Sequence, residues 1–90
     1  MYELHIHRAA EKSMRRAPER IREKCFQFLQ HLRRNGTQHP PCHVKALQGP
    51  FRKLKYLEAI IDEDYRIIFR KEGDAFSIRL AGTHNELHTG

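Results

Sequence analysis

The alternation of hydrophobic and polar positions predicts one strand and two helices in the first 36 residues. Apolar and polar side chains alternate in residues 2–7, the pattern of a strand with one buried face. Residues 9–16 favour a short helix, and a second helix begins around Pro18, because proline is tolerated in a first helical turn. Asn35 and Gly36 end this second helix. Its apolar stripe consists of Ile21, Cys25, Phe28, Leu29 and Leu32.

A long loop and three strands are predicted for the remainder of the chain. Prolines and glycine make residues 37–50 a loop, which residues 44–47 anchor to the core. Strands are expected near 51–59, 64–71 and 74–82, with a turn between the last two. The element order is then β-α-α-β-β-β. This predicts one α+β domain over residues 1–90, with two helices packed on one face of a small, mostly antiparallel sheet.

Alternation within these strands assigns side chains to the two faces of the sheet. The apolar side chains expected on the helix-covered face are Leu54, Tyr56, Tyr65, Ile67, Phe69, Phe76, Ile78 and Leu80. Ile68 and Ala81 are expected on the open face. The cations expected on the open face are Lys53, Lys55, Arg66, Arg70 and Arg79. Such a face suits a phosphate-rich partner, although cations also serve simply to keep an exposed sheet from aggregating.

Composition narrows the classes of function. Lys and Arg exceed Asp and Glu by 17 to 11, a net charge of +6, which favours nucleic acid or an acidic protein as partner. The chain has no apolar run long enough for a membrane span and no leader pattern at Met1, so the expected compartment is the cytoplasm. Cys25 is expected in the core, without a disulfide to Cys42. His39, Cys42 and His43 lack a second well-spaced pair, so no metal is expected. Without a glycine-rich phosphate loop, no nucleotide cofactor is expected either.

Three short segments carry a resemblance to a known family. They are Lys45-Ala-Leu-Gln-Gly49, Tyr65-Arg-Ile-Ile-Phe69 and Gly82-Thr-His-Asn-Glu-Leu-His88. In this order they resemble the RelE/ParE superfamily of toxins from type II toxin–antitoxin systems, and the last resembles the ending of the YafQ-like branch. The resemblance implies the β-α-α-β-β-β fold. It also implies a metal-free mRNA endoribonuclease that cuts in the ribosomal A site through the RNA 2′-hydroxyl, and a cognate antitoxin protein as partner.

The resemblance also implies roles for particular residues. Arg66 lies at the family's phosphate-stabilising strand arginine, and His84 at the histidine of the Gly-Thr-His ending. His88 lies where the family has a terminal residue that stacks on a base or moves a proton. The family's C-terminal arginine falls on Leu80, so Arg79 would have to replace it through a shifted register. Lys45 falls at a loop histidine of the YafQ-like branch. The residues left to contact RNA are Lys45, Lys53, Lys55 and Arg70.

These residue types match the chemistry of RNA cleavage. Attack by the 2′-hydroxyl needs a base, a cation for the crowded phosphorane and an acid for the leaving oxygen. The predicted catalytic residues are Arg66, His84, His88 and Arg79. Glu58 joins Lys53 and Lys55 as a candidate base. Structural roles remain open for Arg66, as an ion-pair partner of Asp62 or Asp64, and for His84, as a turn residue. Two other functions also remain open: DNA gyrase inhibition, as in ParE-like toxins, and RNA binding without catalysis.

Overall fold

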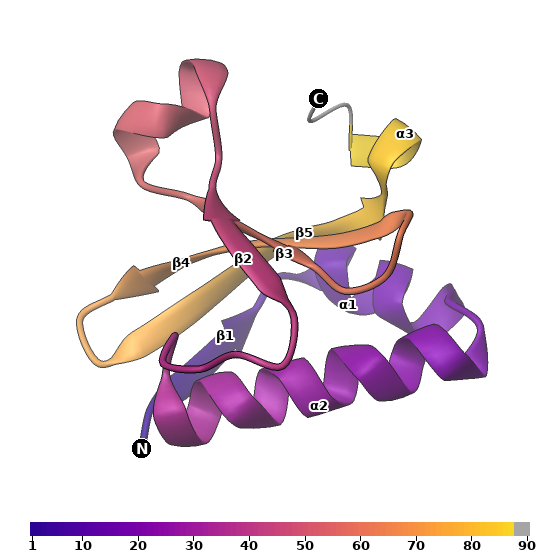
Figure 1. Ribbon diagram of the computed structural model, residues 1–90, viewed down its shortest axis with the longest axis horizontal. Coiled ribbons are helices and arrows are strands. Elements are labelled where there is room, and N and C mark those ends of the chain that lie inside the picture. The colour runs from indigo at the N-terminus through magenta and orange to yellow at the C-terminus, as the bar shows by residue number, and fades with distance from the viewer. Residues whose placement is uncertain (88–90) are drawn as a thin grey trace.

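The computed structural model describes residues 1–87, with only the backbone described for residues 50–52, and confirms the predicted α+β class. A five-stranded sheet is covered on one face by two helices (Figure 1). The elements are β1 Glu3–Ile6, α1 Arg8–Arg16, α2 Glu19–Asn35, β2 His43–Ala46, the 3₁₀ helix η1 Gly49–Leu54, β3 Leu57–Ile60, β4 Tyr65–Glu72, β5 Ala75–Thr83 and α3 His84–Leu87. The strand order is β1-β5-β4-β3-β2, with β1 parallel to β5 and the other pairs antiparallel.

The apolar stripe of α2 forms the core with the helix-facing side of the sheet, as predicted. Phe28 contacts Phe69 edge-on, with ring centroids 5.4 Å apart, and Phe69 contacts Phe76 at 6.0 Å. Tyr65 faces the same side, because its hydroxyl hydrogen-bonds Ser13 of α1 at 2.9 Å. Cys25 is also buried there, with a free thiol. The alternation predicted for β4 is therefore confirmed.

Both ends of α2 follow from local chemistry. Pro18 directly precedes the helix as its N-cap residue, one position before the expected first turn. Gly36 ends the helix with φ of 64°, a conformation that glycine adopts without strain. A Cβ atom at Gly36 would also come within 3.1 Å of the Tyr2 ring. Glycine at this position therefore lets the N-terminal segment pack beside the end of α2.

The predicted strand over residues 51–59 is wrong in its first half. Residues 49–54 form η1, which rises beyond the sheet, and β3 begins only at Leu57 (Figure 1). Residues 43–46, predicted as loop, form the edge strand β2 instead. Gly49 and Lys55 both adopt positive φ, of 76° and 60°, and these bends take the chain out of the sheet and back into it. Consequently Lys53 and Lys55 do not lie on a strand.

A β-bulge overturns the predicted faces at the end of β5. Ile68 pairs with Leu80 and Phe69 with Ile78, so Arg79 is an extra residue with no partner in β4. The bulge reverses the alternation beyond it. Ala81 therefore joins the buried core and Leu80 lies on the open face beside Ile68, opposite to their predicted positions.

In the described part of the chain, no helix has the length and apolar character needed to span a bilayer.

Candidate functional site

Arg66 holds the turn between β3 and β4. Its Nη1 donates hydrogen bonds to the carbonyl oxygens of Asp62 at 2.8 Å and Glu63 at 2.9 Å. The ion pair that the sequence suggested with Asp62 or Asp64 is replaced by these backbone contacts. They use one of the three guanidinium nitrogens and leave the charge uncompensated by any carboxylate among the described residues. Arg66 is therefore both a clamp on the turn and a source of positive charge on the open face.

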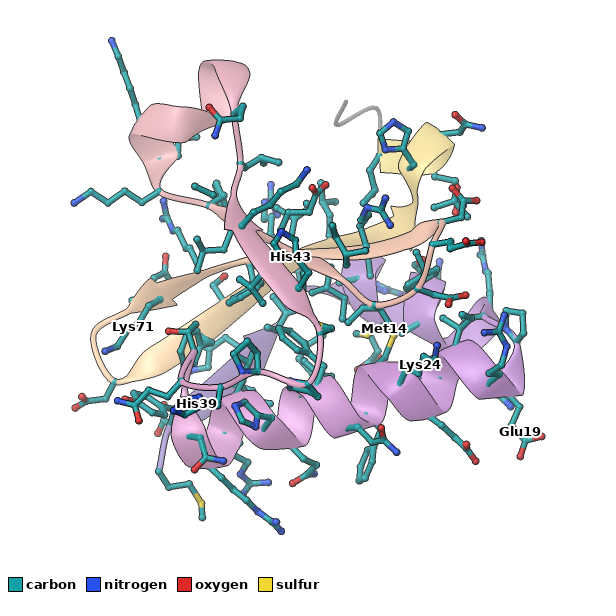
Figure 2. The ribbon with its side chains drawn as sticks, viewed as in Figure 1. Met14, Glu19, Lys24, His39, His43 and Lys71 are labelled. Carbon is teal, nitrogen blue, oxygen red and sulfur yellow. The ribbon has the colours of Figure 1, made fainter. Side chains whose placement is uncertain are left out.

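The same turn is anchored to α2 from the other side. The Asp62 carboxylate lies 3.2 Å from both Arg20 and Lys24. Lys24 projects from α2 in Figure 2. The hydrogen bond from Lys24, with Arg20 beside it, holds the pKa of the Asp62 carboxyl below its usual range. The turn that carries the acceptors of Arg66 is thus fixed at both ends.

His84 is brought to this turn by the short helix α3. Its backbone N–H donates to the carbonyl of Asp64 at 3.0 Å. Thr83 and Glu86 form a reciprocal capping box: the Thr83 N–H donates to Glu86 Oε1 at 2.8 Å, and the Glu86 N–H to Thr83 Oγ1 at 3.2 Å. Gly82 permits α3 to fold close, since a Cβ atom there would lie 3.3 Å from Glu86. The capping contacts therefore explain the residue types of the Gly-Thr-His-Asn-Glu segment, and the same segment places His84 at the turn that Arg66 holds.

A buried carboxylate lies on the open face beside these groups. Glu58 is 3% exposed, and its Oε1 lies 3.6 Å from Nζ of Lys45, its direct partner on β2. Burial of a charged carboxylate is costly without such a partner. Lys45 itself keeps 54% of its side chain exposed, so it covers Glu58 and also faces solvent. The sequence suggested Glu58 as one of three candidate bases, but not its burial or its pairing with Lys45.

Strand register relates the carboxylate to the arginine. Glu58 lies opposite Ile68, and Arg66 lies opposite Ile60, so Glu58 and Arg66 are diagonal neighbours on β3 and β4. Diagonal neighbours on one face have Cβ atoms about 7–8 Å apart, within reach of long side chains. His43, labelled on β2 in Figure 2, lies opposite Ile60 in the same row as Arg66. Glu58, Lys45 and Arg66 therefore occupy neighbouring positions on one face of the sheet.

Arg70 lies farther along the same face of β4. It pairs with Glu72 at 2.8 Å, donates to the carbonyl of Leu54 at 3.2 Å and lies over the Tyr56 ring at 5.0 Å. These contacts attach the chain leaving η1 to the sheet. The exposed side chains of Lys53 and Lys55 extend this end of the molecule. Their predicted role in RNA contact stays a prediction, although their predicted place on a strand is wrong.

Arg79 reaches across the face toward β1. Its Nη1 lies 3.2 Å from Nδ1 of His7, whose Nε2 lies 3.1 Å from Oγ of Ser77. The bulge keeps both Arg79 and Leu80 on the open face, so the one-residue offset from the family arginine does not bury Arg79. His88 lies outside the described residues. Within the described residues, no group of three or more His, Cys, Asp or Glu side chains is arranged to hold a metal ion.

Comparison with known proteins gives a clear result only at the level of structure. No family model and no curated protein sequence matches the chain. YafQ from E. coli superposes with a TM-score of 0.78 at 18% identity, covering 97% of this chain and 98% of YafQ. YafQ in the E. coli DinJ–YafQ toxin–antitoxin complex gives 0.77 at 20% identity, covering 96% of each chain. The RelB–RelE complex of Methanococcus jannaschii gives 0.76 at 14% identity, covering 93% of this chain and 94% of its match. The chain therefore has the fold of the YafQ and RelE toxins along nearly its whole length.

Proposed function

We propose that this protein is the toxin of a type II toxin–antitoxin system and cuts mRNA in the ribosomal A site, in the cytoplasm. The observation that carries the proposal is the patch in which Lys45 and Glu58 lie beside Arg66 and the β3–β4 turn, to which His84 is hydrogen-bonded. It combines the three chemical functions that RNA cleavage needs. The fold that presents this patch is shared with the toxins YafQ and RelE.

Glu58 is the proposed base. It accepts the proton of the RNA 2′-hydroxyl, directly or through one water molecule, with Lys45 stabilising the carboxylate before the proton arrives. The 2′-oxygen then bonds to the adjacent phosphorus, and the bond from phosphorus to the 5′-oxygen breaks. The products are a 2′,3′-cyclic phosphate and a free 5′-hydroxyl, so no metal or oxidant is required.

Arg66 and His84 are the proposed partners of Glu58. Two guanidinium nitrogens of Arg66 are directed to no acceptor among the described residues, so they can bind the phosphorane oxygens as a fork. His84 lies at the turn that Arg66 clamps and can supply the proton for the leaving 5′-oxygen, because imidazole serves as an acid or base near neutral pH. His88 keeps its predicted role as a second proton carrier, and Arg79, which the sequence predicted as a catalytic cation, supplies further positive charge on the same open face.

Induced expression followed by primer-extension mapping of mRNA ends tests this function. We expect cuts within reading frames for the wild type, and loss of cutting in Glu58→Gln at normal folded yield. Glu72→Gln is the matched control, because it makes the same change on the same face at the far end of β4, where Glu72 pairs with Arg70. Intact mRNA with DNA damage would instead favour gyrase inhibition. Intact mRNA and DNA together with RNA binding would favour a binding module.

The partner in this proposal is a small antitoxin that covers the open face. The comparison structures include toxin–antitoxin complexes, and the charge of +6 favours an acidic or amphipathic segment. Binding to the folded toxin alone would also raise its stability by mass action. We expect a neighbouring gene product to co-purify with the toxin from the native operon and to suppress cleavage. A harmless protein that accumulates alone at high level would contradict this.

A further inference from the structure

Arg79, His7 and Ser77 form a connected cluster on the open face at the β1–β5 side of the sheet. Arg79 Nη1 lies 3.2 Å from His7 Nδ1, and His7 Nε2 lies 3.1 Å from Ser77 Oγ. His7 and Arg79 are exposed, whereas Ser77 is 6% exposed and forms the floor between them. The cluster joins residues 70 and 72 positions apart in sequence, so sequence periodicity could not reveal it.

Donor and acceptor chemistry defines the charge of this cluster. A guanidinium can only donate, so Nδ1 of His7 must accept, which makes the imidazole neutral and places its hydrogen on Nε2, toward Ser77. Arg79 is therefore held by an uncharged group. Arg70, on the same face, is neutralised by Glu72 instead. Among the described residues, no carboxylate forms an ion pair with Arg79, so its positive charge is available to an anion.

We propose that Arg79 and His7 bind one phosphate of the RNA backbone beside the phosphate that is cut. The inference rests on the proposed function and assigns a subsite to it. Leu80, next to Arg79, lies in the same row as Glu58 but two strands away, about 10 Å at the usual strand spacing. Because the Arg79 guanidinium also points away from Glu58, toward His7 beside β1, it is placed for a neighbouring phosphate rather than for the phosphorus that Glu58 serves.

Phosphate binding changes the hydrogen-bond partners of Arg79 and His7. A phosphate oxygen replaces Nδ1 of His7 as the acceptor of Arg79, and this contact is stronger because the acceptor is charged. The freed Nδ1 takes up a proton and donates to the same phosphate. Binding is therefore linked to proton uptake by His7 and strengthens as pH falls.

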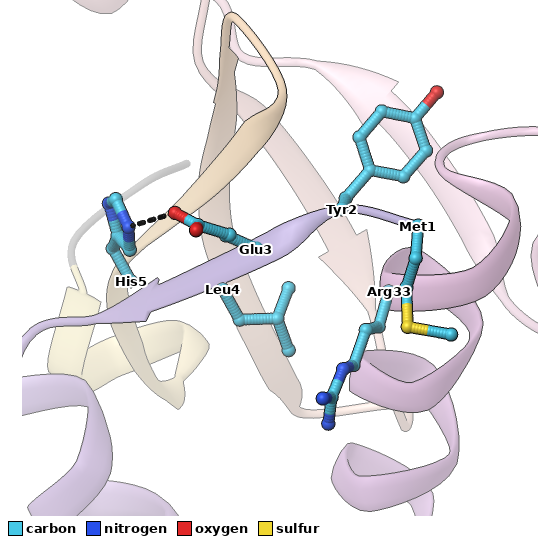
Figure 3. Close-up of a pocket in the computed structure, with 6 residues that line it drawn as sticks. All are labelled: Met1, Tyr2, Glu3, Leu4, His5 and Arg33. Carbon is cyan, nitrogen blue, oxygen red and sulfur yellow. Dashed lines mark hydrogen bonds and ion pairs between the residues drawn. The ribbon is translucent and has the colours of Figure 1, made fainter.

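Other charged groups lie near the cluster, and the test must distinguish their effects on binding from that of His7. Glu3 and His5 lie on β1 and pair with each other at 3.2 Å, as Figure 3 shows, while Arg70 lies opposite Ser77 on β4 with its partner Glu72. The charged residues of the adjoining first turn of α1 are Arg8 and Glu11. Because His5 already has a carboxylate partner, His5→Gln is the matched control for His7→Gln.

The test is a scan of uncleavable 2′-O-methyl RNA in which single phosphates are replaced by neutral methylphosphonates, with affinity measured by fluorescence anisotropy. In the wild type, we expect one position outside the cleavage site whose neutralisation weakens binding. In Arg79→Ala, neutralising that phosphate should no longer change the affinity. The slope of log affinity against log salt should also shrink by about 0.7, the value for one contact to a single strand. Arg79→Lys should retain the position. His7→Gln should reduce the strengthening at low pH, whereas His5→Gln should preserve it.

Two results would overturn the subsite. One is an unchanged phosphate profile in Arg79→Ala, and the other is an unchanged pH dependence in His7→Gln. A wild type that binds no RNA, either alone or on ribosomes carrying the RNA, would overturn the proposed function as well. Cleavage by the wild type with an unchanged profile in the variants would overturn the subsite alone.

Discussion

Replacing Arg66 by alanine should damage cleavage and stability by separate and measurable amounts. The side chain donates from Nη1 to two carbonyl oxygens, at 2.8 and 2.9 Å, in the turn after β3. A hydrogen bond from a charged donor contributes about 1.5–3 kcal/mol, and one half-exposed donor shared by two acceptors lies near the lower end, about 2 kcal/mol. For a domain of this size, 1 kcal/mol shifts the melting temperature by about 4–8 °C, so we expect a loss of about 8–16 °C.

The effect on catalysis should be larger. Removing one group that stabilises transition-state charge typically costs a factor of about 100–1,000 in rate, or about 2.7–4 kcal/mol. The assay is single-turnover cleavage of mRNA on ribosomes at a temperature where circular dichroism shows both proteins to be folded. Arg66→Lys retains the charge but loses the planar fork, so it should fall between wild type and Arg66→Ala in both measurements.

Arg70→Ala provides the comparison that separates the two roles of Arg66. Arg70 lies on the same strand and face, and it also donates to a carbonyl oxygen, at 3.2 Å. Its loss should lower the melting temperature and raise KM, with a much smaller effect on the maximal rate than Arg66→Ala. A folded Arg66→Ala protein that cuts at the wild-type rate would refute the assignment of Arg66 to the phosphorane.

Three further predictions concern the turn, the core and α3. Asp62 has a lowered pKa, so its ion pairs stabilise the fold above the ordinary carboxyl pKa of about 4, and this contribution is lost as pH falls through the lower folded value. The melting temperature of Asp62→Asn should lie below wild type at pH 7, and the difference should shrink as the pH is lowered below the ordinary carboxyl pKa. Burial raises the pKa of the Cys25 thiol to about 11, so a maleimide should label the half-buried Cys42 first and Cys25 only on unfolding. Rapid labelling of Cys25 in the native protein would contradict the core packing. His84→Gln should slow cleavage and flatten its pH dependence with little change in melting temperature. Thr83→Ala should instead lower the free energy of unfolding by about 1 kcal/mol through its lost cap, as measured by urea unfolding. Full activity in His84→Gln would remove the histidine from the mechanism.

Much of the fold could be predicted from short-range patterns. The stripe of α2 and the alternation in β4 depend on neighbours a few residues away, and each period directly reflects which side of the element is buried. The β4–β5 turn is equally local, because Gly73 adopts φ of 63° between strands of matching alternation. Gly82 and Thr83 likewise belong to a motif whose capping contacts span only a few residues.

The strand errors arise at two places where the backbone departs from a regular strand. Alternation predicts a face only while the strand continues without interruption, and Arg79 interrupts it by adding one unpaired residue, which exchanges the sides of Leu80 and Ala81. Apolar and basic residues near Lys53 and Lys55 carry the same alternation as a strand. Their backbone leaves the sheet because Gly49 and Lys55 adopt positive φ, which the pattern of side chains does not record.

The sequence by itself determined the residue types available for the site: the arginines of β4, the histidine after Gly82 and the excess of positive charge. Only the tertiary structure decided their partners. The register of β2 on β3 pairs Lys45 with Glu58, and the packing of β1 on β5 brings His7 to Arg79. These contacts join residues 13 and 72 positions apart. Their geometry depends on how strands align across the whole sheet, and no local period in the chain encodes that alignment.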